Sequence, residues 1–165
     1  MSGGSPGRIL AIVGPGEGAS LDDIAAAERL AELAARAGWV VSCGGRNAGV
    51  MAGAARGAAR SGGLAIGLLP SDDSSEAAPE LSLALATGLG EARNAVLAQS
   101  CEAMVACGMN AGTAAELALA LKAGKPVVLI RPDRAAGEFF QSLAPAQVKL
   151  ASSADEAFGL LTTSS

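Results

Sequence analysis

The segment from Gly108 to Glu116 combines residue types that can bind an anionic ligand. It follows a short apolar run, expected as a strand over Ala103–Cys107, and precedes a helix expected from Thr113 to about Ala123. Its glycines let the main chain approach a ligand closely. Free N–H groups and the positive dipole end at a helix N-terminus favour phosphate and other anions. The segment therefore predicts one wall of an anion-binding cleft.

Glu116 has two interpretations, which do not exclude each other. Thr113 and Glu116 match a capping box, in which the hydroxyl and the carboxylate satisfy each other's backbone N–H groups at a helix start. Alternatively, the Glu116 carboxylate takes part in ligand chemistry. The sequence leaves both roles open.

Two arginines can supply positive charge to the same cleft. Arg46 lies among Gly44, Gly45 and Gly49, where a planar guanidinium can reach a phosphate, although a loop arginine can also simply be solvated. Arg93 lies near the start of a helix expected over 91–100, where a cation is unfavourable beside the helix dipole. We therefore expect Arg93 to contact a bound anion or to pair with Glu116.

Strands and helices alternate along the chain and would place these residues at one edge of a sheet. Apolar runs predict strands over 8–13, 39–42, 64–69, 81–86, 103–107, 126–130 and 147–150. Helical patterns lie between them, and this alternation predicts right-handed crossovers and a mostly parallel sheet. We expect one domain over 8–162, after a flexible tail at 1–7. The polar stretch 70–79 is expected to form a surface loop that can serve as a mobile flap over the cleft.

Composition excludes several function classes. The net charge of −4 and the lack of a basic run argue against nucleic-acid binding. The chain has no histidine, and Cys43, Cys101 and Cys107 lack metal-ligand spacing, so no protein-held metal is predicted. We expect these cysteines to be buried, and their odd number favours a reducing compartment such as the cytoplasm. No apolar run is long enough to span a membrane. The first turn carries Ala19 where a dinucleotide fingerprint needs its third glycine, which argues against NAD binding.

Several motifs resemble the Rossmann-like family once labelled lysine-decarboxylase-like. Gly112, Thr113 and Glu116 match the end of the Pro-Gly-Gly-x-Gly-Thr-x-x-Glu motif of its cytokinin-activating phosphoribohydrolases, and Gly108-Met109-Asn110 replaces the Pro-Gly-Gly. Arg93 has a spacing from Glu116 that suits the family's arginine–glutamate pair. The combined segments resemble the algal molybdenum cofactor carrier proteins more closely. They are 44–46, 49–51, 87–90, 108–109, 112–116, 119–122, 125–129, 139–140 and 142–143.

This resemblance implies a single-domain Rossmann-like α/β fold with helices on both faces of the sheet. It also implies a homotetramer that binds, protects and carries molybdenum cofactor to apo-molybdoenzymes such as nitrate reductase. The alternatives are a nucleoside 5′-monophosphate phosphoribohydrolase using Arg93 and Glu116, and a nucleotide-sensing scaffold. We expect the cofactor to contact Gly14, Gly16, Gly44, Gly45, Arg46, Asn47, Gly49, Gly88, Arg93, Gly108, Met109, Asn110, Ala111, Gly112, Thr113 and Glu116.

The helix expected over 113–123 is apolar around most of its circumference. A surface helix normally carries a single apolar stripe. The sheet can cover only one side of such a helix, so we expect a second subunit to cover the other.

Overall fold

The computed structural model describes residues 7–163 and contains seven strands and six α-helices. The strands are β1 (Ile9–Val13), β2 (Val40–Cys43), β3 (Ala65–Leu69), β4 (Leu83–Ala86), β5 (Ala103–Cys107), β6 (Val127–Ile130) and β7 (Val148–Ala151). The helices are α1 (Leu21–Arg36), α2 (Gly49–Arg60), α3 (Arg93–Ser100), α4 (Ala111–Lys122), α5 (Arg134–Leu143) and α6 (Ala154–Thr162), and a 3₁₀ turn, η1 (Gly90–Ala92), precedes α3.

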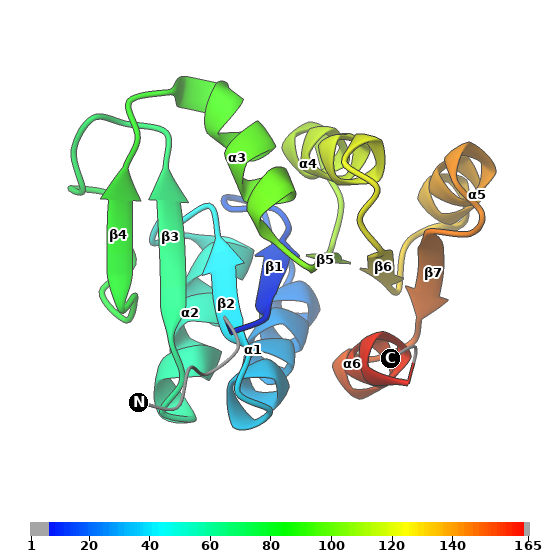
Figure 1. The fold of residues 1–165 in the computed structure, drawn as a ribbon, viewed down its shortest axis with the longest axis horizontal. Helices are drawn as coiled ribbons and strands as arrows, with labels where there is room; N and C mark the ends of the chain where they lie inside the picture. Colours follow the sequence, from blue (N-terminus) through cyan, green and yellow to red (C-terminus); the bar gives the residue numbers. More distant parts are fainter. Residues whose placement is uncertain (1–6, 164–165) are drawn as a thin grey trace.

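All seven strands are parallel and form one sheet in the order β4-β3-β2-β1-β5-β6-β7. The chain first builds outward from β1 through β2 to β4, and then returns to the other side of β1 with β5 (Figure 1). The gap between the carboxyl ends of β1 and β5 is thus the topological switch point, where open parallel sheets bind ligands. The Rossmann-like fold expected from the sequence is confirmed.

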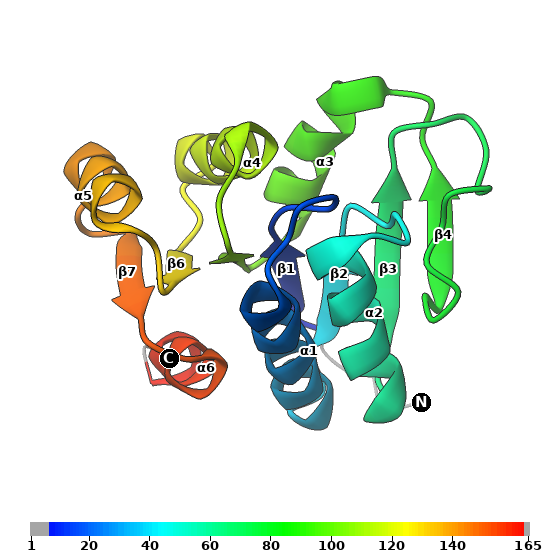
Figure 2. The ribbon, with the colours of Figure 1, turned by 180° about the vertical axis from the view of Figure 1, so that it is seen from behind.

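Helices cover both faces of the sheet. α1, α2 and α6 pack on one face, and α3, α4 and α5 pack on the other (Figures 1 and 2). The central strand β5 is buried throughout, because it has helices on both sides. The edge strand β4 leaves Leu83 and Leu85 exposed.

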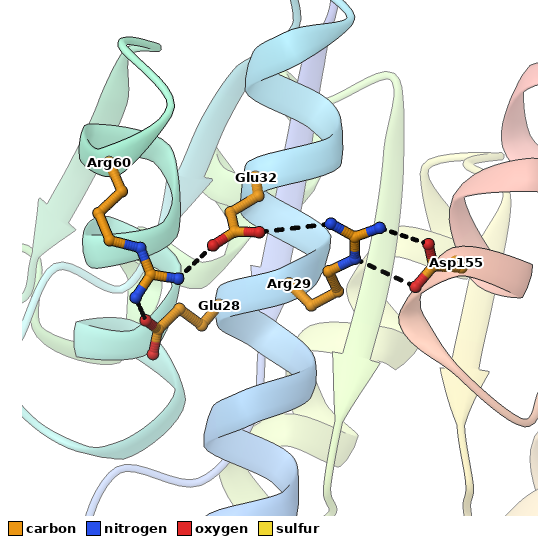
Figure 3. A network of polar contacts seen from close by, with 5 residues as sticks. All are labelled: Glu28, Arg29, Glu32, Arg60 and Asp155. Atoms are coloured by element: carbon orange, nitrogen blue, oxygen red, sulfur yellow. Dashed lines mark hydrogen bonds and ion pairs between the residues drawn. The ribbon is translucent and has the colours of Figure 1, made fainter.

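A network of ion pairs joins the three helices on the first face. Arg60 of α2 contacts both Glu28 and Glu32 of α1, and Glu32 in turn contacts Arg29 at 3.4 Å (Figure 3). Arg29 forms two hydrogen bonds with Asp155 of α6, the shorter at 2.7 Å. Each charged group in this network therefore has a partner of opposite charge.

Two helix starts differ from those expected. α4 begins at Ala111 rather than at Thr113, because the Asn110 side chain caps it and accepts the Thr113 N–H at 2.8 Å. Of the two interpretations of Glu116, the capping box is therefore wrong, and Glu116 is not a capping residue. The helix expected over 91–100 starts with the 3₁₀ turn η1, where no side chain caps the chain, and the backbone bonds of a tighter turn serve instead.

Two further expectations concern the tail at the start of the chain and the lack of a membrane-spanning segment. Of the tail expected over 1–7, all but Gly7 lies outside the described residues. Between residues 7 and 163, no helix is long and apolar enough to cross a membrane.

Candidate functional site

A cavity of about 220 Å³ lies at the switch point of the sheet. Its walls come from the turns after β1, β2 and β3, the start of α2, η1 with the first turn of α3, and the cap and first two turns of α4. The lining residues are Gly14, Arg46, Met51, Pro70, Glu91, Arg93, Asn94, Asn110, Gly112, Thr113 and Glu116. Seven of these residues are among those expected from the sequence.

Arg93 projects from the first residue of α3 toward the end of β3. Its guanidinium donates a hydrogen bond to the Leu68 carbonyl at 2.8 Å, while its Nε is buried without a partner. Gly44 makes room for this group, because a Cβ there would lie 2.5 Å from a guanidinium nitrogen. Burial lowers the pKa of Arg93 from its ordinary value, and the charge of Glu116 opposes that change.

Glu116 lies in the second turn of α4 and is 8 % exposed. Burial raises the pKa of its carboxyl to about 7, although the positive charge of Arg93 acts in the opposite direction. The two side chains interact electrostatically, but no ion pair within 4.0 Å joins them in the described chain. Glu116 therefore faces the cavity as a buried carboxyl without a hydrogen-bond donor.

Arg46 lies at the mouth of the cavity and is partly exposed. Glu17 and Glu76 approach its guanidinium at 3.7 and 3.6 Å, both longer than a good hydrogen bond. The loop expected as a flap is fastened here, since the Ala78 N–H bonds to the Gly45 carbonyl and the Asn47 N–H to the Glu76 carbonyl. This part of the 70–79 loop is thus a fixed wall beside Arg46.

The start of α4 forms the opposite wall. Asn110 accepts hydrogen bonds from both the N–H and the hydroxyl of Thr113. A Cβ at Gly112 would meet only the Asn110 Oδ1, at 3.5 Å, so the backbone there borders open space. The first turn of α4 can therefore present main-chain N–H groups to an anion in the cavity.

The remaining expected residues do not line this cavity. Gly16, Gly44, Gly45, Asn47 and Gly49 build the turns behind it, and a Cβ at Gly49 would overlap the backbone of Gly16. Gly88 lies in the turn after β4, and Ala111 is exposed at the start of α4. Gly108 and Met109 line a neighbouring cavity of about 180 Å³ with Asp23 and Arg131.

Four lining residues were not expected from the sequence: Met51, Pro70, Glu91 and Asn94. Asn94 is 8 % exposed, and its Oδ1 is buried without a partner. Its position three and four residues before Leu97 and Ala98 places it on the buried stripe of α3, so a polar residue in an apolar helix pattern was the available signal.

The cysteines are buried and free, as expected. Burial raises the pKa of Cys43 and Cys101 to about 11 and that of Cys107 to about 12, so all three are protonated thiols near neutral pH. In the described part of the chain, no group of three potential ligands could hold a metal ion.

Comparison with known proteins places the chain in a family. The model of the SLOG cluster4 family matches residues 7–158. The chain belongs to this family. One relative, an uncharacterized protein of Archaeoglobus fulgidus, is 36% identical over 125 residues. These residues make up 74% of this chain and 80% of that protein.

Several solved structures resemble nearly the whole chain. The molybdenum cofactor binding protein of the phototrophic bacterium Rippkaea orientalis is 41% identical, with a TM-score of 0.94 over 97% of this chain and 98% of its own. The molybdenum cofactor carrier protein of Chlamydomonas reinhardtii is 38% identical, with a TM-score of 0.91 over 96% and 98%. The family resemblance expected from the sequence motifs is confirmed.

Proposed function

We propose that this protein binds and carries molybdenum cofactor, protects it from oxidation, and delivers it to apo-molybdoenzymes such as nitrate reductase. The observation that carries the proposal is its likeness, over nearly the full length of both chains, to proteins described as binding or carrying this cofactor. The free thiols and the expected reducing compartment support action in the cytoplasm.

The chemistry of the cavity supports this ligand. Molybdenum cofactor is a pterin with a phosphate, and its own dithiolene holds the metal. The protein must therefore bind the phosphate and the ring, and the metal requires no protein ligand. Arg46 and the first turn of α4 suit the phosphate, and the buried polar groups suit a heterocycle.

The test is to purify the protein from cells that make the cofactor, oxidise the sample, and measure pterin fluorescence. We expect pterin to co-purify with the folded protein, and Arg46→Ala to retain less of it. A wild-type sample without pterin, which also fails to take up cofactor added under anaerobic conditions, would contradict the proposal.

The arrangement of Arg93 and Glu116 also suits a phosphoribohydrolase, because a carboxyl with a pKa near 7 can transfer protons at neutral pH. We nevertheless expect no useful turnover. Met109 and Asn110 replace two glycines of the enzyme motif, and the Asn110 side chain is used in capping α4. Small displacements of reacting groups cost large factors in rate.

A sensitive assay of adenine release from AMP separates these functions. We expect no release by the wild type above that of Glu116→Ala. Robust release that the substitution abolishes would establish the enzyme. Binding of AMP without release, and without any affinity for cofactor, would favour the nucleotide-sensing scaffold.

We further propose a homotetramer. α4 buries only Thr113, Glu116, Leu117 and Ala120 within this chain, and its apolar outer side stays partly open. Val96 of α3 adds exposed apolar surface on the same face of the sheet. Light scattering at micromolar concentration should show a multiple of 16.0 kDa, and a 16.0 kDa particle would contradict this.

A further inference from the structure

Three polar groups in the depth of the cavity have hydrogen-bonding capacity that the described protein does not use. The Glu116 carboxylate has no hydrogen-bond donor, and the Asn94 Oδ1 and the Arg93 Nε have no partner. Buried polar groups are usually satisfied, and each exception costs free energy. A bound ligand that supplies the missing hydrogen-bond partners would explain such a cluster at a binding cavity.

The unused groups define the edge that the ligand must present. Glu116 offers two acceptor oxygens side by side, Asn94 offers a third acceptor, and Arg93 offers one donor. The complementary edge carries a ring N–H and an exocyclic amino group next to a carbonyl oxygen. This is the cyclic acylguanidine edge of a pterin, and guanine has the same one.

Resting on the proposed function, we infer that Glu116 binds the N3–H and 2-amino group of the pterin ring, with Asn94 and Arg93 beside it at the amino group and the 4-oxo group. The ring would then lie in the depth of the cavity.

The size and the charge distribution of the cavity agree with this orientation. Its volume of about 220 Å³ is below the roughly 300–1,000 Å³ of pockets that enclose a whole ligand, so it takes the flat ring and leaves the rest at the mouth. Arg46 lies at that mouth and is partly exposed. A ligand inserted ring first would place its phosphate beside Arg46 and the start of α4, and its metal end toward the solvent, from which it can be transferred.

The experiment compares 6-hydroxymethylpterin with 6-hydroxymethyllumazine, which carries an oxo group in place of the 2-amino group. Ligand-observed NMR at about pH 7 measures both affinities for the wild type and for Glu116→Gln. We expect the wild type to prefer the pterin by about 10-fold or more, because the lumazine turns an acceptor toward the carboxylate. Glu116→Gln should bind the pterin about 10- to 100-fold more weakly and lose the preference, since an amide replaces one acceptor with a donor.

Glu138→Gln is the matched control, because this carboxylate pairs with Arg134 on the exposed surface of α5. It should keep the wild-type preference. Circular dichroism checks that both variants are folded. A loss of overall affinity without a change in the ratio of the two ligands would show a merely structural effect and would overturn the assignment.

The remaining outcomes separate this inference from the proposed function. A wild type that co-purifies with cofactor but does not distinguish the two rings contradicts the ring assignment alone. A wild type that binds neither the cofactor nor the pterin contradicts both. GMP shares the acylguanidine edge, and tighter binding of GMP than of the pterin would assign Glu116 to a guanine nucleotide and overturn the assignment to a pterin.

Discussion

Arginine and glutamate occur together in two regions of this molecule, with opposite consequences. Between α1, α2 and α6, every guanidinium and carboxylate of the network has a close partner of opposite charge (Figure 3). In the cavity, Arg93 and Glu116 are both largely buried and make no direct ion pair. The ion pairs of the first region hold helices together, whereas the polar groups of the cavity have hydrogen-bonding capacity that the protein itself does not use.

This difference shows how a site can be distinguished from a structural contact of the same composition. Paired charges near the surface cost little to keep and contribute little stability. A buried carboxyl without a donor destabilises the folded protein, and it persists where a ligand uses it. A binding site is therefore distinguished from a structural contact by whether its buried polar groups have hydrogen-bond partners, and not by residue type.

The largest expected effect is on ligand affinity at the mouth of the cavity. Arg46→Ala should weaken cofactor binding roughly 10- to 150-fold, about 1.5–3 kcal/mol, because a charge-assisted contact is lost while the fold remains. Titration under anaerobic conditions measures this. Arg60→Ala removes an arginine that is also held by two carboxylates, and it should leave affinity unchanged. Equal losses of cofactor affinity in the two variants would show that the cavity and the ion-pair network do not differ in ligand binding.

The second expected effect is on stability and depends on pH. The pKa of Glu116 rises from 4.5 to about 7 on folding, so the folded protein holds a proton that the unfolded chain releases between these values. Below about pH 4.5, Glu116 therefore hardly changes the free energy of unfolding. Its destabilising effect grows as the pH rises and reaches its full value above pH 7. Glu116→Gln, which resembles the protonated form, should be more stable than the wild type by about 3 kcal/mol at pH 8 and nearly equal to it at pH 4.

Urea denaturation of the ligand-free protein at the two pH values measures this difference. Glu32→Gln is the control from the paired network, where Arg60 and Arg29 lower the pKa of the carboxyl. That substitution should destabilise the protein slightly at pH 8, since a surface ion pair contributes little stability. If Glu116→Gln also destabilised it there, Glu116 would be a structural residue like Glu32.

The smallest expected effect concerns the backbone at the start of α4. Gly112→Ala adds a methyl group beside the cavity, where only the Asn110 Oδ1 lies within 4 Å. We expect cofactor affinity to fall by roughly fivefold, about 1 kcal/mol, since the backbone N–H groups are partly screened, and stability to stay equal or rise. Gly159→Ala in α6 also meets open space and should leave affinity unchanged. Unchanged affinity in Gly112→Ala would remove this backbone from the site.

Much of the fold could be predicted from the sequence, because local patterns determine it. Apolar runs such as Leu10–Val13 and Val127–Ile130 can be buried only as central strands, and the helices between them require parallel crossovers. The glycine-rich turns and Arg46 were also identified, since tight turns restrict residue type. Asn94 was missed as a site residue because its role depends on which face of α3 turns toward the cavity.

The sequence by itself determined the α/β class, the family and the turns that carry the site, because those depend on periodicity and on residues that few backbone conformations accept. Only the tertiary structure decided the role of Glu116. Its spacing from Thr113 fits a capping box, in which Glu116 would accept the Thr113 N–H. In the structure the Asn110 side chain accepts this N–H instead, and α4 begins two residues earlier than expected. Glu116 then turns toward the cavity with Arg93 and Asn94, whose positions depend on how α3 packs beside α4, and sequence spacing does not specify that packing.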